Sequence, residues 1–292
     1  MKTIYEKYEN GFKKAQAGEY VFDNAQKNAE ERYRTLSILY DANTVRHLKN
    51  RGVEEGWSCL EVGGGGGSIA HWLCLRVGLA GRVLATDIHP QFLERLSFSN
   101  LEVRRHDIRR ESPPASQFDL AHIRLVLMHL PEPEIALKRI IDALKPGGWI
   151  VAEEFDALSL LPDPVVYPGE VSLKVRQAFH DVLTARGVDL RFGRSLPQKL
   201  QAQGLVNIGV EASASLWGAN SVGASHMKLS FRELHEPMVR CGLISQEEFD
   251  ADLDHIDDQD FLMPSPMLWT TWGAKPSSSD SKPAASQRFV YW

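Results

Sequence analysis

Five consecutive glycines at residues 63–67 constrain the fold of this 292-residue chain more than any other feature. They follow a short apolar run at 58–62 and precede a segment in which Ile69 and Trp72 recur at helical spacing. A strand, a glycine turn and a helix in this order are typical of the nucleotide-binding loop of α/β proteins. Glycine is needed there because the chain turns tightly, partly at positive φ, and brings bare backbone against a ligand. The loop therefore predicts an α/β fold that binds a nucleotide-like ligand.

The segments after this loop alternate between strand and helix patterns. Further strands are predicted at 82–86, 101–105, 118–127 and 149–155, and helices near 67–77, from Pro90 and over 131–144. The last of these helices is expected to end at the Lys-Pro-Gly-Gly sequence of residues 145–148, since proline cannot continue a helix and glycine suits the left-handed cap. Five strands that alternate with helices predict a parallel sheet covered by helices on both faces.

The rest of the chain is divided into flanking segments and insertions. Residues 1–55 are expected to form an N-terminal helical cap segment, with one helix over 29–48. The core is assigned to 56–274, with later strands at 205–212 and 267–272 and helices at 171–186, 197–203 and 222–254. Helical lid insertions are expected near 157–192 and 218–262, and residues 275–292 form a Ser- and Pro-rich tail.

Charge and cysteine content exclude several classes of partner. The formal net charge of -5, without a long basic run, disfavours nucleic acid, because phosphate binding needs a basic surface. The sequence shows neither an apolar signal region nor the ~18-residue apolar run of a membrane span. Three scattered cysteines, Cys59, Cys74 and Cys241, indicate buried thiols in a reducing compartment rather than metal ligands. We therefore expect a cytoplasmic protein without a metal, nucleic acid or membrane partner; its oligomeric state stays open, with a homodimer as one option.

Two classes of cofactor use a strand, glycine turn and helix, and the spacing of the glycines separates them. The dinucleotide fingerprint G-x-G-x-x-G/A fits only when it begins at Gly65, two residues late relative to the end of the strand. An acid followed by alternate glycines, Glu61-x-Gly63-x-Gly65-x-Gly67, fits completely and in place. Because a run of glycines satisfies many patterns, the loop by itself leaves both classes open.

The second pattern resembles motif I of class I S-adenosylmethionine-dependent methyltransferases, and the resemblance continues over roughly residues 55–156. Asp87 ends the second strand, where this family keeps an acid for the ribose hydroxyls. The sequence His106-Asp107-Ile108 resembles the segment whose acid meets the adenine amino group and whose next residue packs on the ring. Residues 118–130 resemble the fourth strand and its loop, and the sequence at 144–148 before the fifth strand is frequent in the family.

The resemblance implies a Rossmann-like, doubly wound fold. Its sheet is expected to be mostly parallel and seven-stranded, with an antiparallel last strand and a helical cap. S-adenosylmethionine is the implied cofactor and S-adenosylhomocysteine its product. The residues expected to bind it are Glu61, Gly63, Gly65, Gly67, Asp87, Ile88, Asp107, Ile108 and Arg124. Gly64 and Gly66 are expected to be spacers, and Glu61 to orient the loop and reach the amino group of the cofactor.

Methyl transfer is a displacement at a sulfonium methyl group, so the protein must align the nucleophile and exclude water. A general base assists when the nucleophile carries a proton. Polar candidates gather at the predicted ends of the fourth and fifth strands: His122, Arg124, His129, Glu153, Glu154 and Asp156. We favour Glu154 and His129 as catalytic residues, since both are expected to face the cleft at the carboxyl edge of the sheet.

The expected acceptor is a small, aromatic or natural-product-like molecule, methylated on oxygen, nitrogen or carbon in secondary metabolism. The cap and lid segments are expected to enclose it, with Tyr20, His226 and His235 as candidate lining residues. Trp217, Trp269 and Trp272 are candidates for packing an aromatic substrate, although tryptophans of this kind belong more often to the core. One alternative is a methyltransferase-like protein that binds S-adenosylmethionine without transferring its methyl group, as a ligand-binding module or a catalyst of rearrangement. Another is an NAD-dependent oxidoreductase, which Glu61 and the late register of the dinucleotide fingerprint disfavour.

Overall fold

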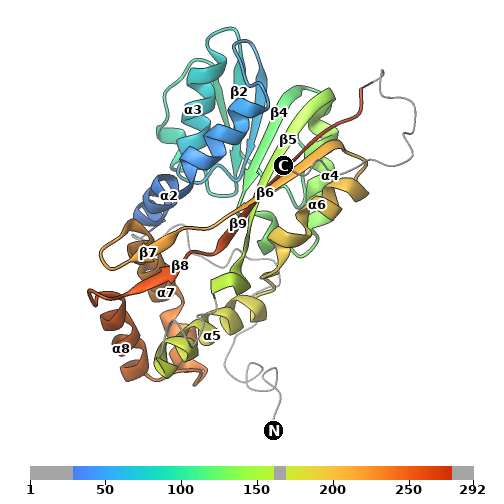
Figure 1. Cartoon of the computed structure of the whole chain (residues 1–292). Coiled ribbons are helices and arrows are strands. Elements are labelled where there is room, and N and C mark those ends of the chain that lie inside the picture. Colours follow the sequence, from blue (N-terminus) through green and yellow to red (C-terminus); the bar gives the residue numbers. More distant parts are fainter. Residues whose placement is uncertain (1–28, 161–168, 278–292) are drawn as a thin grey trace.

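The computed structural model describes residues 29–160 and 169–277 (Figure 1). Predictions that concern residues 1–28, 161–168 and 278–292 lie outside the described residues. These predictions are the first half of the N-terminal cap segment, part of the first lid insertion and most of the tail.

Seven strands form one sheet in the order β3-β2-β1-β4-β5-β9-β6. They are β1 (Ser58–Val62), β2 (Arg82–Asp87), β3 (Leu101–Arg105), β4 (Phe118–Arg124), β5 (Leu144–Asp156), β6 (Val206–Ser213) and β9 (Met267–Ala274). Strands β1 to β5 are parallel wherever they pair, and β9 is antiparallel to both β5 and β6. The predicted doubly wound, mostly parallel, seven-stranded sheet with an antiparallel last strand is therefore confirmed.

Consecutive residues of the central strands are buried on opposite faces of this sheet. Cys59 of β1 packs with Leu73, whereas its neighbour Leu60 packs with Ile140. The helices are α2 (Ala29–Asn50) and α3 (Ser68–Val77) on the first face, and α4 (Pro133–Ala143) and α6 (Phe192–Ala202) on the second. Because side chains alternate along a strand, helices on both faces require the continuous apolar runs that the sequence contains.

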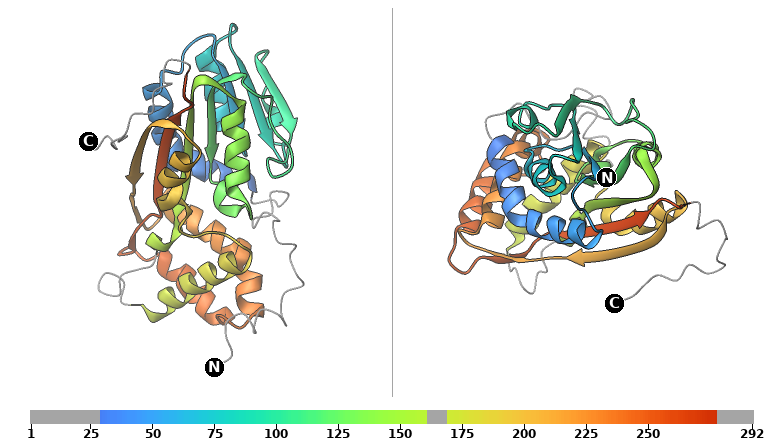
Figure 2. Two further views of the ribbon diagram at one scale, coloured as in Figure 1. Left: turned by 90° about the vertical axis from the view of Figure 1, so that its right-hand side faces the viewer. Right: turned by 90° about the horizontal axis from the view of Figure 1, so that it is seen from above.

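The remaining helices gather beyond one end of the sheet (Figure 2). They are α5 (Glu170–Ala185), α7 (Val222–Arg240) and α8 (Gln246–Ile256), joined by a two-stranded sheet of β7 (Leu216–Gly218) and β8 (Leu262–Pro264). Helix α7 packs against α2, where Nε of Arg32 lies 3.2 Å from Oε2 of Glu233. Helix α2 therefore contacts both the sheet and these helices.

Three predicted helices have different bounds. The helix expected from Pro90 is only one 3-10 turn at Leu93–Arg95, because Leu93 is its single fully buried residue and offers no apolar stripe for a longer helix. Helix α6 begins at Phe192 rather than at Pro197, since Phe192 and Leu196 are both buried against the sheet side. The helical stretch predicted over 222–254 is interrupted between α7 and α8.

Two strand boundaries also differ from the prediction. Residues 145–148 belong to β5 rather than to a helix cap, because Leu144 is already extended and pairs with Phe118. The fourth strand ends at Arg124 instead of continuing to 127, since Leu125 turns the chain at φ 57° and a 3-10 turn follows at Leu127–His129. The small β7-β8 sheet was not predicted. The early end of β4 moves residues 125–129 into a loop at the carboxyl edge of the sheet.

Candidate active site

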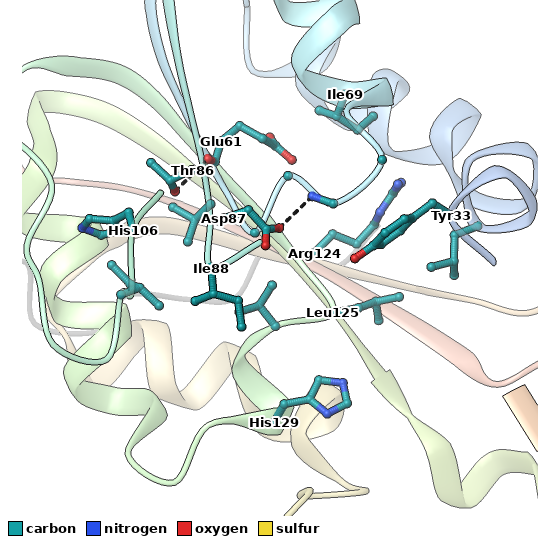
Figure 3. A pocket seen from close by; sticks show the side chains of 18 of the residues that line it. Tyr33, Glu61, Ile69, Thr86, Asp87, Ile88, His106, Arg124, Leu125 and His129 are labelled. Atoms are coloured by element: carbon teal, nitrogen blue, oxygen red, sulfur yellow. Dashed lines mark hydrogen bonds between the residues drawn. The ribbon is translucent and has the colours of Figure 1, made fainter. Parts of the chain in front are cut away.

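A cleft opens at the carboxyl ends of β1, β2 and β4, between the glycine loop and α2 (Figure 3). Its lining includes these residues predicted to bind the cofactor: Glu61, Gly63, Gly65, Asp87, Ile88, Asp107, Ile108 and Arg124. Gly67 does not line the cleft, whereas Gly64 and Gly66, expected only as spacers, do. Ligands of open α/β sheets bind at this edge. The structure thus brings together all but one of the predicted cofactor residues.

Two glycines of the loop hold conformations and positions that a side chain would disturb. Gly63 has φ 67°, and a Cβ atom there would lie 2.4 Å from Cγ2 of Val126. Gly65 has φ 49°, and a Cβ atom there would lie 2.7 Å from the ring of Tyr33. Both positions therefore need glycine for backbone freedom and for close packing. Gly67, at φ 85°, acts instead as the N-cap of α3.

Asp87 ends β2 in the middle of the cleft. Its Oδ2 accepts a hydrogen bond of 3.0 Å from the backbone N–H of Gly65, and its Oδ1 accepts one of 2.8 Å from His89. Burial raises the pKa of this carboxyl, and the backbone hydrogen bonds oppose the rise. The side chain is held in one orientation by the glycine loop, with lone pairs left for a ligand hydroxyl.

Asp107 and Ile108 follow β3 and line the same cleft as Asp87. Both carboxylate oxygens of Asp107 accept hydrogen bonds of 2.8 Å from the guanidinium of Arg109, which lowers the pKa of Asp107. Ile108 is buried beside it. The carboxylate is thus fixed by an ion pair with Arg109, and its remaining lone pairs are what it can offer to an amino group.

Arg124 and Glu61 connect the cleft with buried polar groups. The guanidinium of Arg124 donates hydrogen bonds of 2.8 Å to Thr44 and to Asp41, both on α2. Oε2 of Glu61 lies 2.7 Å from Nδ1 of the buried His122. Both predicted residues line the cleft, and both also support its walls.

Tyr33 is a cleft residue that sequence reasoning missed. It lies on α2, lines the cleft and packs over Gly65 and Gly66 (Figure 3). Its ring also meets Phe92 edge-on, with centroids 5.4 Å apart. The sequence places Tyr33 in the predicted helix at 29–48, but no local pattern shows which distant loop that helix covers.

A second cavity lies between this cleft and the helices beyond the sheet. Its lining is Arg32, Leu36, Leu125, Met128, His129, Phe155, Ala157, Phe179, Leu183, Trp217, His226, Met227, Ser230, Phe231 and Pro266. Three of these residues, Leu36, Leu125 and His129, also line the cleft, so the two spaces share a wall. The wall is mostly apolar and aromatic, which suits a hydrophobic ligand.

Only some of the residues predicted to contact the acceptor line this cavity. Trp217 and His226 line the cavity, and Oγ1 of Thr35 lies 2.8 Å from Nδ1 of His226. His235 is instead at the surface, hydrogen-bonded to Gln246. Trp269 and Trp272 lie on β9 and do not line either space.

His129 lies in the wall that the cleft and the cavity share (Figure 3). Removal of the ring from water and, to a smaller extent, the positive charge of Arg32 lower the pKa of His129 to about 3. A histidine with this pKa is neutral at physiological pH and keeps one nitrogen lone pair. Of the two residues favoured for catalysis, His129 is therefore the one with access to a ligand.

Glu154 lines neither the cleft nor the cavity and is fully buried. Its Oε1 accepts hydrogen bonds from the backbone N–H groups of Val126 at 3.0 Å and Leu127 at 2.6 Å. These bonds hold the loop that carries His129. Burial raises the pKa of Glu154 to about 8, although the backbone donors oppose the rise. The geometry gives Glu154 a positioning role in place of the expected contact with the reacting groups.

The other polar candidates at the strand ends are also engaged inside the protein. His122 and Glu153 are completely buried. Asp156 accepts a hydrogen bond of 2.9 Å from Nε of Arg194. Within residues 29–160 and 169–277, no group of three or more His, Cys, Asp or Glu side chains is arranged to hold a metal ion. In the same ranges, no helix is long and apolar enough to cross a membrane.

Replacing Glu154 with glutamine is expected to make the unfolding free energy less sensitive to alkaline pH. The folded pKa of about 8 exceeds the value of about 4.5 for an exposed carboxyl, so the protonated acid favours folding fully below pH 4.5 and loses that contribution as pH rises through 8. Glutamine does not ionise, so from pH 5 to pH 9 the unfolding free energy of the variant should rise by about 4 kcal/mol relative to that of wild type. Urea unfolding at pH 5, 7 and 9 measures this difference.

Glu132→Gln, at an exposed position before α4, is the matched control and should follow the wild-type pH profile. Titration of every other group cancels in the comparison of variant and wild type. A difference between Glu154→Gln and wild type that stays constant with pH would contradict the buried, protonated state of Glu154.

Comparisons with known proteins identify the family of this chain. A family profile described as a methyltransferase domain matches residues 21–220. Methyltransferase str3 of Strobilurus tenacellus is 33% identical over 148 residues, which cover 49% of this chain and 50% of that protein. The ubiquinone/menaquinone biosynthesis C-methyltransferase UbiE of Laribacter hongkongensis is 34% identical over 114 residues, 37% of this chain and 47% of that protein. The chain thus spans about half the length of these curated relatives.

A solved structure extends the likeness to the fold. Phosphoethanolamine N-methyltransferase 2 of Haemonchus contortus, in complex with phosphomonomethylethanolamine and S-adenosylhomocysteine, aligns with a TM-score of 0.54. The alignment covers 89% of this chain and 61% of that chain at 16% identity, and so shows a shared fold. The motifs, the sheet order and the family profile agree with one another. The chain belongs to the methyltransferase domain family, and the predicted resemblance to class I S-adenosylmethionine-dependent methyltransferases is confirmed.

Proposed function

We propose that this protein transfers the methyl group of S-adenosylmethionine to a small, neutral, aromatic or apolar acceptor. One observation carries the proposal: the cleft and the apolar cavity share the wall formed by Leu36, Leu125 and His129. A donor in the cleft and an acceptor in the cavity would meet at that wall, which is the proximity that a direct displacement requires.

The residues of the cleft suit the donor. Asp87 would accept the ribose hydroxyls, Asp107 and Ile108 would hold the adenine, and the glycine loop with Glu61 would hold the amino-acid part. Tyr33 closes over Gly65 and keeps water from this end of the cleft. When bound, the cofactor supplies an electrophilic methyl group.

His129 would then accept the proton of an acceptor hydroxyl or N–H group as the methyl group is transferred. Its side chain lies in the wall that the two spaces share, and its imidazole is neutral at physiological pH, the protonation state that a proton acceptor needs. A pKa of about 3 makes it a weak base, so its position rather than its basicity supports this role. Glu154 fixes the loop of His129 through the backbone of Val126 and Leu127. An acceptor that attacks through carbon would use His129 to remove the proton from the neighbouring hydroxyl or from the ring.

The polar groups of the cavity support a neutral acceptor. Arg32 is paired with Glu233, and burial lowers the pKa of His226 to about 3, so that its imidazole is neutral. The rest of the wall is largely apolar or aromatic, including Phe179, Trp217 and Phe231. The curated name of the Laribacter relative, a quinone biosynthesis C-methyltransferase, also fits a ring acceptor. We place the acceptor among phenols, quinols, indoles and related natural products of secondary metabolism.

Radiolabelled methyl transfer tests this function. Full-length protein is incubated with labelled S-adenosylmethionine and with separate panels of quinols, simple phenols and indoles, with phosphoethanolamine as a charged comparison. Label is expected in one of the ring classes and not in phosphoethanolamine. Transfer to phosphoethanolamine alone would overturn the assignment of a neutral acceptor.

Calorimetry on the same preparation separates the other hypotheses. The wild-type protein should bind S-adenosylmethionine and S-adenosylhomocysteine and should not bind NAD. Binding of these ligands with no label in any acceptor would favour a cofactor-binding protein without methyl transfer. Binding of NAD alone would favour an oxidoreductase.

A further inference from the structure

Three ionisable side chains form a buried row beneath the glycine loop. Glu61 of β1 and His122 of β4 are paired in register, and Glu153 comes from the next strand, β5. Oε2 of Glu61 lies 2.7 Å from Nδ1 of His122, and Oε2 of Glu153 lies 3.3 Å from Nε2 of the same ring. The side chains of His122 and Glu153 are completely shielded from solvent, and that of Glu61 is 5% exposed. The mechanism proposed above uses neither His122 nor Glu153.

The geometry requires a protonated ring. A neutral imidazole has one N–H and can donate to only one of two carboxylates, whereas an imidazolium donates to both. The two acids raise the pKa of His122 to about 9 against the opposing effect of burial, and His122 with Arg124 and Thr44 lowers the pKa of Glu153 to about 2. At neutral pH the ring of His122 is therefore positively charged and Glu153 is negatively charged.

The two ends of the row differ in their surroundings. Glu153 is satisfied inside the protein: its oxygens accept hydrogen bonds from Thr44 and Asn43 of α2 and from Thr270 of β9. Glu61 reaches the cleft, and among the described residues only Oε2 of its carboxylate takes a hydrogen bond. The row thus ends in a carboxylate oxygen at the position where a positively charged ligand would complete the charge balance.

We propose that His122 is a positioning residue for the cofactor, which holds the carboxylate of Glu61 turned so that its second oxygen binds the α-ammonium group. Glu153 in turn contacts the other side of the His122 ring and links it to α2 through Asn43 and Thr44. Buried charges raise the free energy of the folded protein unless each is paired. The α-ammonium group of the ligand would supply the second partner of the Glu61 carboxylate. The inference rests on the proposed binding of S-adenosylmethionine, but its test measures ligand binding rather than methyl transfer.

The test compares two ligands that differ in the group concerned. S-adenosylhomocysteine carries the α-ammonium group, and 5′-methylthioadenosine has the same nucleoside and thioether without the amino-acid part. Calorimetry on full-length His122→Asn should show about a tenfold or larger loss of affinity for S-adenosylhomocysteine, the scale of one hydrogen bond to a charged group. Affinity for 5′-methylthioadenosine should change by less than about twofold. His180→Asn, which replaces another buried histidine far from Glu61, should change neither affinity.

A double-mutant cycle distinguishes positioning from general damage. Glu61→Gln should also lose affinity for S-adenosylhomocysteine alone, and adding His122→Asn to it should cause no further loss, because His122 acts through Glu61. His122→Gln, which like asparagine has an amide donor but no positive charge, provides the same comparison where the asparagine variant folds poorly. Equal losses for both ligands, or additive losses in the double variant, would overturn the proposal. If wild type binds neither ligand, the proposed function itself fails rather than the role of His122.

Discussion

Replacement of His129 by alanine is expected to lower kcat for methyl transfer by about 100-fold or more, the usual contribution of a general base. The reason is that His129 lies in the wall between the cleft, where we propose that the donor binds, and the cavity, where we propose that the acceptor binds, with a neutral imidazole at physiological pH. The dissociation constant of S-adenosylhomocysteine should stay within about twofold of wild type, because Asp87 and the glycine loop are unchanged. Steady-state assays with the first acceptor that wild type methylates, together with calorimetry, measure both quantities.

The pH profile provides a second readout for His129. A folded pKa of about 3 means that this base is unprotonated at every pH above that value, so it should produce no acidic limb in kcat from pH 5 upward. His235→Ala, at a half-buried position on α7 outside the cleft and the cavity, is the control and should retain wild-type kcat. A wild-type kcat in His129→Ala would remove His129 from the mechanism. A parallel loss of S-adenosylhomocysteine affinity would indicate a collapsed loop rather than a lost base.

The sheet and the residues that line the cleft were predictable because their signals are local. Continuous apolar runs mark strands that are covered on both faces, and an acid at the end of such a run, as at Asp87, must lie at the carboxyl edge. Glu61 and the alternate glycines lie within seven residues of one another at the end of a strand, so one turn of the chain brings them together. Short-range order along the chain is enough to predict such a site.

The acceptor side was less predictable because it depends on orientation and on distant contacts. Glu153 and Glu154 are neighbours on β5, so their side chains must face opposite sides of the sheet. The sequence shows only that both are acids near the end of a strand, and not which face each one occupies. The structure turns Glu153 toward His122 and Glu154 toward the backbone of Leu127, so neither reaches a ligand. Tyr33 reaches the glycine loop only through the packing of α2, which no local pattern contains.

Substitution of Asp87 by alanine is expected to weaken S-adenosylhomocysteine binding by about 1.5–3 kcal/mol, the usual contribution of hydrogen bonds to a charged group. This corresponds to about a 10- to 150-fold higher dissociation constant. The carboxylate lines the cleft and is oriented toward it by the backbone N–H groups of Gly65 and His89. Calorimetry measures the change, and Glu102→Ala, an exposed acid on the adjacent strand β3, should bind as wild type.

Alanine at position 87 also removes the acceptor for the Gly65 N–H group, so a second substitution is needed to isolate the ribose contact. Asp87→Asn keeps an acceptor oxygen of the same reach and removes the charge. Wild type should bind 5′-methylthioadenosine more tightly than its 2′-deoxy analogue, because the analogue lacks one of the two ribose hydroxyls. That preference should shrink in Asp87→Asn, because a neutral amide binds a hydroxyl less strongly than a carboxylate does. The melting temperature of the variant should stay near that of wild type. If the preference persists unchanged in Asp87→Asn, the ribose hydroxyls bind elsewhere and Asp87 serves only to hold the glycine loop.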